Sequence, residues 1–351
     1  MRIVVNDIAA STGGALTVLH SFYQEVMSHD DNHTWIFLTG DPTLIHQNTR
    51  IQVICFPHIK NSRLKRMIFD LISGKKILDS LHPDVIFSLQ NTIIFGAKCR
   101  QVLYIHQPIP FQSVKQFSLF QKEEAPYAVY QHFIGKIIKF SASHANHIIV
   151  QTQWMCDAVT KCCKVDRNKI AVIPPDPAIA PVTHCSDDLF DYNSFFYPSS
   201  DVIYKNNNLL IESVNRLVAD GYKPKLEITI QGESNSYVKY LGRIDYSNVL
   251  KRYSRNTLVF PSYIETFGYP LVEAKEAGTI ILASDTSFAH ELLDGYENAY
   301  YFPFNDKDAL VKLMKDVMDK KILRKNIERH HTEKTANWER VYNLVTSNDK
   351  Q

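Results

Sequence analysis

Two carboxylates, Glu265 and Glu273, have seven residues between them in the segment Glu-Thr-Phe-Gly-Tyr-Pro-Leu-Val-Glu. The apolar run before them, Leu258–Phe260, predicts a buried strand. Pro270 and Gly278 predict where the following helix begins and ends, because proline suits a first helical turn and glycine a helix end. Glu265 is therefore expected on the loop between strand and helix, and Glu273 in the first turn of that helix.

The segment between the two glutamates could bind a phosphate group. The amides near Phe267 and Gly268 are expected to point out of a helix N-terminus, which favours anions. Carboxylates on either side can accept hydrogen bonds from hydroxyl groups. An acidic first turn that favours the helix macrodipole would explain Glu273 alone. The whole pattern instead predicts a pocket for a sugar, a diphosphate and a ribose.

Four more residues lie at the expected ends of strands. Gly13 and Gly14 follow the first strand, where glycine lets a ligand approach the backbone closely, although a plain tight connection is an equal alternative. His106 ends the strand Val102–Ile105, and it either contacts a ligand or is simply hydrogen-bonded within the fold. Lys205 follows a strand in the second half of the chain.

Short apolar runs alternate with amphipathic segments along the whole chain, which predicts parallel strands joined by crossover helices. We therefore expect an α/β fold with two doubly wound, Rossmann-like domains that face each other across a cleft. The predicted strands are Ile3–Val5, Trp35–Leu38, Gln52–Cys55, Val85–Ser88, Val102–Ile105, His147–Val150, Ala171–Ile173, Phe195–Tyr197, Leu226–Ile230, Val238–Leu241, Thr257–Phe260 and Ile280–Ala283. The predicted helices are Leu16–Met27, Arg63–Leu78, Trp154–Cys162, Asn208–Leu217, Asn248–Tyr253, Leu271–Ala277, Asp308–Met318 and Trp338–Val345.

The run Pro174–Pro181 holds four prolines in eight residues, and so many prolines cannot continue a helix or a central strand. We interpret it as part of a linker at 176–185. The predicted domains are then two Rossmann-like domains, at 1–175 and at 186–335, followed by a final helix in 336–351.

Composition narrows the class of protein. The chain has 351 residues, 45% of them hydrophobic and 22% charged, which is typical of a globular protein. A net charge of +2 argues against a dedicated nucleic-acid binder. The six cysteines do not form the paired spacing of a zinc site, and we assign no metal and no cofactor. The first residues lack the apolar core of a signal peptide, and no run could span a membrane, so a cytoplasmic location is expected.

The segment around Glu265 and Glu273 resembles the donor-sugar signature of the retaining glycosyltransferases of family 4, which have the GT-B fold. The resemblance spans most of the chain and is sharpest over residues 258–285. It implies that Glu265 lies beside the donor sugar and that Glu273 binds the ribose of the nucleotide. It also places Lys205 at the diphosphate. It assigns acceptor binding to the domain at 1–175 and nucleotide-sugar binding to the domain at 186–335, and it implies that the final helix in 336–351 crosses back to the first domain.

By the same resemblance, His106 lies by the ring of the donor sugar, and bacterial polysaccharide enzymes of the family look similar here. The amides of Gly13 and Gly14 would face the donor phosphates or the acceptor. The family usually has an arginine shortly before the lysine, but residues 199–201 of this chain are Ser-Ser-Asp. Either one cation suffices, or another residue such as Arg243 supplies the second charge.

These features predict a hexosyltransferase that moves a sugar, with retention, from a nucleoside-diphosphate sugar to a hydroxyl of a glycan. The expected acceptor is a polyprenyl-diphosphate-linked oligosaccharide of O-antigen, capsule or exopolysaccharide assembly. The basic, amphipathic segment at 61–76 would then touch the cytoplasmic face of the inner membrane. The commoner explanation of such charges is that they lie on the solvent-facing side of a helix. Two alternatives stay open: another GT-B enzyme, such as a nucleotide-sugar epimerase, and a non-catalytic sugar-binding partner subunit.

Overall fold

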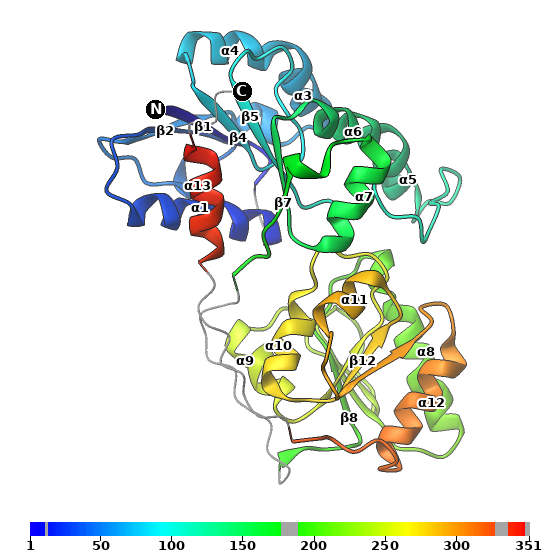
Figure 1. Cartoon of the computed structure of the whole chain (residues 1–351). Coiled ribbons are helices and arrows are strands. Elements are labelled where there is room, and N and C mark those ends of the chain that lie inside the picture. Colours follow the sequence, from blue (N-terminus) through cyan, green and yellow to red (C-terminus); the bar gives the residue numbers. More distant parts are fainter. Residues whose placement is uncertain (11–12, 177–188, 327–335, 348–351) are drawn as a thin grey trace. The chain divides into compact units, whose positions relative to one another are not determined.

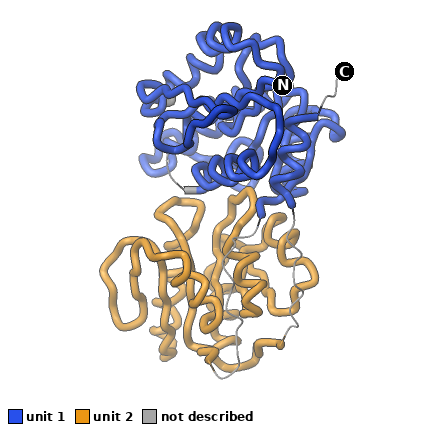
Figure 2. Tube along the Cα trace, turned by 90° about the vertical axis from the view of Figure 1, so that its left-hand side faces the viewer, with its two compact units in different colours: residues 1–176, 334–351 blue, residues 177–333 orange. Residues whose placement is uncertain are grey.

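The computed structural model describes residues 1–10, 13–176, 189–326 and 336–347. The chain forms two compact units (Figure 2). Unit 1 comprises residues 1–176 and 334–351, and unit 2 comprises residues 177–333. Apart from Asp176, the predicted linker lies outside the described residues.

Unit 1 is built on a parallel sheet with the strand order β3-β2-β1-β4-β5-β6-β7. The order reverses direction between β1 and β4, and ligands of such sheets bind at the carboxyl ends of the strands beside this switch point. Its strands are β1 (Arg2–Asp7), β2 (Thr34–Thr39), β3 (Ile51–Cys55), β4 (Val85–Ser88), β5 (Arg100–Ile105), β6 (His147–Val150) and β7 (Ile170–Val172).

Helices cover this sheet (Figure 1). They are α1 (Gly13–Ser28), α2 (Pro57–Lys60), α3 (Arg63–Ile68), α4 (Gly74–Leu81), α5 (Ala125–Val129), α6 (Gly135–His144) and α7 (Gln153–Cys163). Two π-helical turns, η2 (Phe69–Ser73) and η3 (Tyr130–Ile134), join α3 to α4 and α5 to α6. Short 3₁₀ turns are η1 (Pro42–Leu44) and η4 (Arg167–Lys169).

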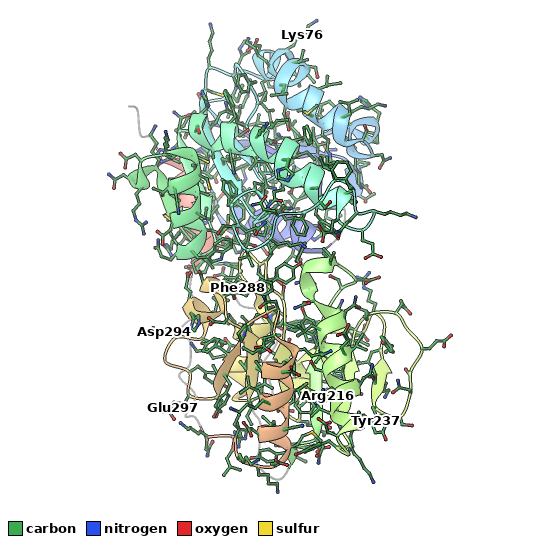
Figure 3. All side chains as sticks on the ribbon, turned by 90° about the vertical axis from the view of Figure 1, so that its right-hand side faces the viewer. Lys76, Arg216, Tyr237, Phe288, Asp294 and Glu297 are labelled. Carbon is green, nitrogen blue, oxygen red and sulfur yellow. The ribbon has the colours of Figure 1, made fainter. Side chains whose placement is uncertain are left out.

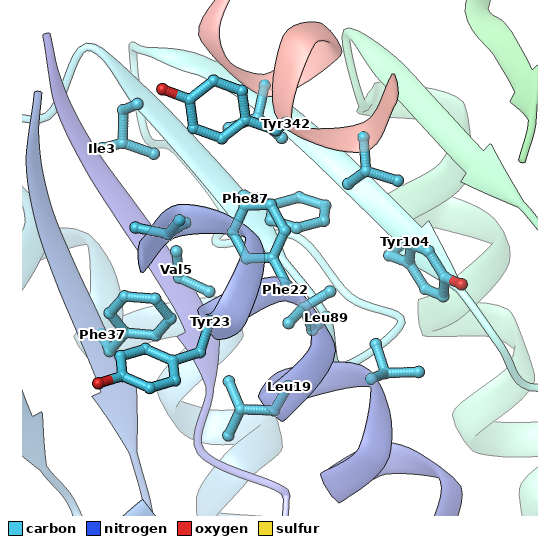
Figure 4. Packing of buried hydrophobic residues seen from close by; sticks show 14 of the residues in the cluster. Ile3, Val5, Leu19, Phe22, Tyr23, Phe37, Phe87, Leu89, Tyr104 and Tyr342 are labelled. Atoms are coloured by element: carbon cyan, nitrogen blue, oxygen red, sulfur yellow. The ribbon is translucent and has the colours of Figure 1, made fainter. Parts of the chain in front are cut away.

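The last helix, α13 (Asn337–Thr346), belongs to the core of unit 1 and packs beside α1. Figure 4 shows this core, in which Phe22 of α1 and Phe87 of β4 meet edge to face at 4.7 Å. The ring of Trp338 stacks on that of Tyr104 at 6.1 Å, and Tyr342 lies against Trp35. The end of the chain therefore supplies part of the apolar face that covers the first strands.

Unit 2 repeats the architecture with the parallel order β10-β9-β8-β11-β12-β13. Its switch point lies between β8 and β11. The strands are β8 (Ser194–Tyr197), β9 (Lys225–Ile228), β10 (Val238–Tyr240), β11 (Thr257–Phe260), β12 (Ile281–Ser284) and β13 (Ala299–Phe302). The helices are η6 (Ile203–Lys205), α8 (Asn207–Ala219), α9 (Tyr246–Tyr253), α10 (Tyr269–Ala277), α11 (Ser287–Leu292) and α12 (Lys307–Met318).

The predicted fold class is confirmed, since both units are doubly wound parallel sheets. Every predicted strand is present to within two residues at each end, but β13, α2, α5, α6 and α11 were not predicted. The single helix expected at 63–78 is interrupted by the π turn η2. The placement of Glu273 in a first helical turn is wrong: α10 begins at Tyr269, so Glu273 is its fifth residue and lies in the second turn.

Candidate functional site

Lys205 and Glu265 meet at the switch point of unit 2. Lys205 ends the loop after β8, and Glu265 lies on the loop after β11, the neighbouring strand. The Lys205 ammonium donates to Oε1 of Glu265, and their side chains are only 20% and 15% exposed. The hydroxyl of Ser262 donates to the same oxygen at 2.7 Å. A largely buried cation thus stands at the switch point, where sheets of this kind bind their ligands.

The backbone around Lys205 is held by contacts with neighbouring strands. The hydroxyl of Tyr197 in β8 donates to the Lys205 carbonyl at 3.0 Å. Asn206 adopts a left-handed conformation with φ of 58°, and its amide donates to the carbonyl of Phe304 at 2.7 Å. The ring of Phe260 lies 6.0 Å from the Lys205 ammonium. These contacts fix the lysine stem, so its charged end has little freedom.

The N-terminus of α10 lies directly after this ion pair. Gly268 caps the helix with φ of 100°, a conformation that a residue with a side chain rarely adopts. Within the described residues, no acceptor takes the backbone N–H of Phe267 or Gly268. The expected anion site at a helix N-terminus is therefore geometrically open here, next to the cation of Lys205.

Glu273 is held by two tyrosines of α9. Its Oε1 accepts from the hydroxyl of Tyr246 at 2.8 Å, and its Oε2 accepts from that of Tyr253 at 2.9 Å. Burial is the main influence on this carboxyl, and it raises the pKa of Glu273 above its ordinary value, while the two hydroxyls act in the opposite direction. A carboxylate has about four acceptor positions. Two therefore remain for the hydroxyls of a ligand.

Tyr246, Tyr253 and Ser262 were missed by the sequence analysis. The two tyrosines are seven residues apart on α9, so they lie on one face of that helix. This spacing was a usable signal, but only the packing of α9 beside α10 shows that the face meets Glu273. Arg243, considered as a second phosphate-binding cation, is exposed on the loop after β10 and contacts no acidic side chain among the described residues.

The remaining predicted residues lie in unit 1. The backbone N–H of His106 donates to Oδ1 of Asn91 at 2.8 Å, and its ring packs edge to face on Tyr104 at 5.9 Å. Its Nδ1 is buried without a hydrogen-bond partner. Burial lowers the pKa of His106 to about 4, so the ring is neutral at physiological pH. A neutral ring can offer one donor and one acceptor to a ligand.

Gly13 and Gly14 form the first residues of α1. A Cβ atom built on Gly14 would meet nothing within 4 Å, so the packing of unit 1 does not require glycine at this position.

Two buried aspartates beside the switch point of unit 1 were also missed. Asp7 ends β1, and both of its carboxyl oxygens are buried without a hydrogen-bond partner. Asp70 of η2 accepts from Nε2 of Gln90 at 2.9 Å and Oγ1 of Thr92 at 2.7 Å. Burial raises the pKa of Asp7 to about 8 and that of Asp70 to about 7. Unpaired buried carboxylates are costly, so Asp7 is mainly protonated at neutral pH.

The structure thus brings Lys205, Glu265 and the start of α10 together in unit 2, with Glu273 one turn into that helix. His106, Gly13 and Gly14 lie at the carboxyl ends of strands in unit 1. A cavity of about 1010 Å³ in unit 2 is lined by none of these residues. It lies at the opposite ends of the strands, beside the first residues of β8 and β9 and the end of α9. Within the described ranges, no three His, Cys, Asp or Glu side chains could hold a metal ion together.

Known proteins match the chain in both sequence and structure. The family described as Glycosyltransferase Family 4 matches residues 12–175, and the family described as Glycosyl transferases group 1 matches residues 190–334. The O-antigen chain mannosyltransferase RfbU of Salmonella typhimurium is 24% identical over 244 residues, which cover 66% of this chain and 68% of that protein.

Two solved structures share the fold over nearly the whole chain. WaaG, a glycosyltransferase involved in lipopolysaccharide biosynthesis, has a TM-score of 0.66 at 12% identity, covering 98% of this chain and 100% of that one. HepE of Anabaena, in complex with UDP and glucose, has a TM-score of 0.62 at 15% identity, covering 98% of this chain and 95% of that one.

The buried carboxyl of Asp7 generates a prediction about stability and pH. The pKa of Asp7 rises from 3.8 in the unfolded chain to about 8 in the folded chain. Between pH 4 and pH 8 the folded chain therefore keeps a proton on Asp7 that the unfolded chain has lost. Because of this difference, the free energy of unfolding falls as the pH rises from 4 to 8. We expect Asp7→Asn to match the wild-type melting temperature at pH 4 and to exceed it at pH 8 by roughly 4 °C or more.

The control is Asp79→Asn, because Asp79 forms an exposed ion pair with Lys75 and should change the melting temperature little at either pH. Scanning calorimetry at four pH values between 4 and 8 measures both variants. A constant difference between Asp7→Asn and wild type across this range would contradict a neutral, buried Asp7.

Proposed function

The chain belongs to the glycosyltransferases of family 4 and has the GT-B fold, and we propose that it transfers a hexose with retention from a nucleoside-diphosphate sugar to a hydroxyl of a glycan. It is a glycosyltransferase of polysaccharide biosynthesis. The observation that carries the proposed donor is the placement of Lys205 and Glu265 at the switch point of unit 2, beside the open amides of α10.

Each part of this site suits one part of a nucleotide sugar. Lys205 and the amides of Phe267 and Gly268 would hold the diphosphate, and Glu273 would accept from the ribose hydroxyls. Glu265 would lie beside the donor sugar. His106 would contact the sugar ring from unit 1 as a neutral hydrogen-bonding group. Gly13 and Gly14 would leave room for the donor phosphates or the acceptor.

The transfer step follows from this placement. The bond between the anomeric carbon and the diphosphate oxygen breaks, and negative charge grows on the diphosphate. Lys205 and the amides of α10 are aimed at that charge, so they stabilise the transition state more than the bound donor. The acceptor hydroxyl forms the new bond on the same face of the ring and gives its proton to the departing diphosphate. No divalent metal takes part in the proposed step.

The acceptor is proposed to be an oligosaccharide linked to polyprenyl diphosphate, in the assembly of O-antigen, capsule or exopolysaccharide. The mannosyltransferase RfbU, named for O-antigen chains, supports this setting, as does WaaG, named for lipopolysaccharide biosynthesis. No helix of the described residues is long and apolar enough to cross a bilayer. The cytoplasmic face of the membrane is the proposed place of this reaction.

The direct test is turnover with a panel of nucleotide sugars and a lipid-linked acceptor, in excess EDTA. We expect free nucleoside diphosphate and a glycosylated acceptor in equal amounts, with the α or β configuration of the donor kept in the product. Loss of activity in EDTA with rescue by magnesium would refute the metal-free step. Conversion of the nucleotide sugar without an acceptor would favour an epimerase, and binding without any turnover would favour a sugar-binding subunit.

Glu273 is expected to anchor the ribose. Glu273→Gln should weaken binding of the free nucleoside diphosphate by roughly 1.5–3 kcal/mol, because a charge-assisted acceptor is lost while the size of the side chain is kept. Calorimetry measures the affinity, and Glu212→Gln on the exposed side of α8 is the control. The wild-type affinity should also fall on acidification, as Glu273 becomes protonated. Because the pKa of Glu273 is raised, this loss should begin at a higher pH than it would for an ordinary glutamate. Unchanged affinity in folded Glu273→Gln would rule out this role.

Lys205 and Glu265 are expected to act in opposite directions on nucleotide affinity. In the ligand-free chain the Lys205 ammonium pairs with the Glu265 carboxylate. A diphosphate that binds Lys205 would have to compete with this carboxylate. Lys205→Ala should therefore weaken nucleoside-diphosphate binding by ~1.5–3 kcal/mol and lower kcat/KM by about tenfold to a few hundredfold. Glu265→Gln should keep or improve that affinity while lowering turnover.

Lys239→Ala serves as the control, because Lys239 lies on β10 and its side chain is 64% exposed. Equal losses of affinity in Lys205→Ala and Glu265→Gln would show that the ion pair acts as a structural unit. They would contradict the assignment of Lys205 to the diphosphate and of Glu265 to the sugar.

A further inference from the structure

The cavity of about 1010 Å³ in unit 2 lies at the N-terminal ends of the strands, away from the ion pair at the switch point. Its lining includes Ser194 at the start of β8 and Lys225 at the start of β9. Figure 3 shows Phe288 of α11 near one end of unit 2 and Tyr237, which lines the cavity, toward the other end. Because α11 follows the carboxyl end of β12, the cavity is separate from the proposed donor site.

Cations dominate the charged side chains around this cavity. Its lining contains five cations and one acid, and the cations are Lys225, Lys239, Lys251, Arg252 and Arg255. The acid is Glu227, whose oxygens face Arg252 at 2.7 Å and Lys239 at 3.5 Å. Asp191, which is not part of the lining, pairs with Lys225 at 2.9 Å. These two acids offset two of the five cations and leave an excess of three, whereas the whole chain has a net charge of only +2.

The macrodipole of α9 explains some of these cations but not all of them. Lys251 and Arg252 lie in the last turn of α9, where a positive charge stabilises a helix. Lys225 and Lys239 lie on β9 and β10, and strands have no comparable dipole. Among the described residues, neither Lys251 nor Arg255 forms an ion pair with an acidic side chain. These two cations are therefore available to an anionic ligand.

The uncharged part of the lining is rich in groups that form hydrogen bonds. Serine and asparagine occupy seven of its sixteen positions, so hydroxyl and amide groups outnumber the apolar side chains. Within the part of the chain that the structure describes, no partner takes the side chains of Ser236, Tyr237 and Asn248. The partly buried ring of Tyr237 adds a flat apolar surface with a polar end. Such a lining suits the hydroxyls and the ring face of a sugar.

The size of the cavity and the distribution of its charges indicate the kind of ligand. Ligand pockets commonly have about 300–1,000 Å³, so this cavity is large for a single phosphate ion. Its cations are spread over β9, β10 and the end of α9, so they can meet negative charges at several points of one ligand. We propose that the cavity binds an acidic oligosaccharide. Its carboxylates pair with the cations, and its hydroxyls bond the serine and asparagine side chains.

This site would hold a part of a glycan that does not take part in the transfer. The chain is a glycosyltransferase of polysaccharide biosynthesis, so a site for an already formed, acidic stretch of glycan goes beyond its reaction. The proposal does not depend on the donor assigned to the switch point, because Lys205, Glu265 and Glu273 are absent from the lining. An acidic peptide would also meet the cations, but it offers few hydroxyls to the rest of the lining.

The test is calorimetry of the whole chain with tetragalacturonic acid, which carries a carboxylate on every sugar, at fixed ionic strength. Maltotetraose has the same number of sugars without the charges and should bind far more weakly. Hexaglutamate has the charges without the sugar hydroxyls and should also bind far more weakly. Saturation with a nucleoside diphosphate should leave the affinity for tetragalacturonic acid unchanged, because the donor site lies at the other end of unit 2.

Variants of the lining separate the two kinds of contact. Lys251→Gln with Arg255→Gln should weaken binding of tetragalacturonic acid by roughly tenfold to a hundredfold, because two cations that bond its carboxylates are lost. Tyr237→Ser should weaken it by about threefold to tenfold, because the ring contact is lost. The matched control, Lys161→Gln with Lys312→Gln, removes the same charge from exposed positions of α7 and α12 and should leave binding unchanged.

Several outcomes would overturn the proposal. Tetragalacturonic acid does not bind, or hexaglutamate binds as tightly, or the control pair weakens binding as much as the cavity pair does. Competition by the nucleoside diphosphate would place the oligosaccharide at the switch point and would equally overturn it. Lys251 and Arg255 are exposed, so their replacement should leave the melting temperature at the wild-type value. Nucleotide affinity should also stay unchanged in these variants, which keeps this result separate from the proposed reaction.

Discussion

The ion pair between Lys205 and Glu265 joins two loops that leave the sheet of unit 2 on either side of its switch point. Both side chains are largely withdrawn from water, so each charge depends on the other and on the Ser262 hydroxyl. A half-buried pair gains little net stability, because its desolvation offsets much of its attraction. Its effect is positional, because it holds a cation beside the amides at the start of α10.

The same separation of stability from function is visible in unit 1. Asp7, Asn6 and Gln90 carry buried polar atoms without partners, and the Nδ1 of His106 does too. All of them lie at the ends of β1, β4 and β5, on the edge where parallel sheets bind ligands. Buried polar groups without partners lower stability, and a fold retains them where they serve a ligand or water. The apolar core supplies the compensation, including the aromatic side chains of α13 packed on α1.

The architecture explains how two small sheets can each carry part of a site. The switch point lies between β1 and β4 in unit 1 and between β8 and β11 in unit 2. The loops that follow these paired strands therefore start next to each other. In unit 2 these loops supply Lys205 and Glu265, and in unit 1 they supply Asp7 and Asn91. The repetition of one topology thus places different side chains at the equivalent strand ends of the two units.

By itself, the sequence determined the fold class and most of the strands, because short apolar runs between amphipathic segments leave few alternatives to a parallel sheet. It also determined where α10 ends, since Gly278 adopts the left-handed backbone conformation that closes a helix. It failed at β13, where Ala299–Phe302 is only partly buried and its pattern is weak. It also failed at the turn of Glu273, which depends on the residue at which the helix starts.

Only the tertiary structure decided which groups meet. The pairing of Lys205 with Glu265 joins residues sixty positions apart, and the tyrosines on Glu273 come from a different helix. The burial of Asp7 was equally hidden, because a residue type does not reveal which neighbours will cover it. Local pattern fixes strands and helices through short-range sterics and periodicity, whereas charge pairing, pKa and exposure are set by contacts that exist only after the sheets have formed.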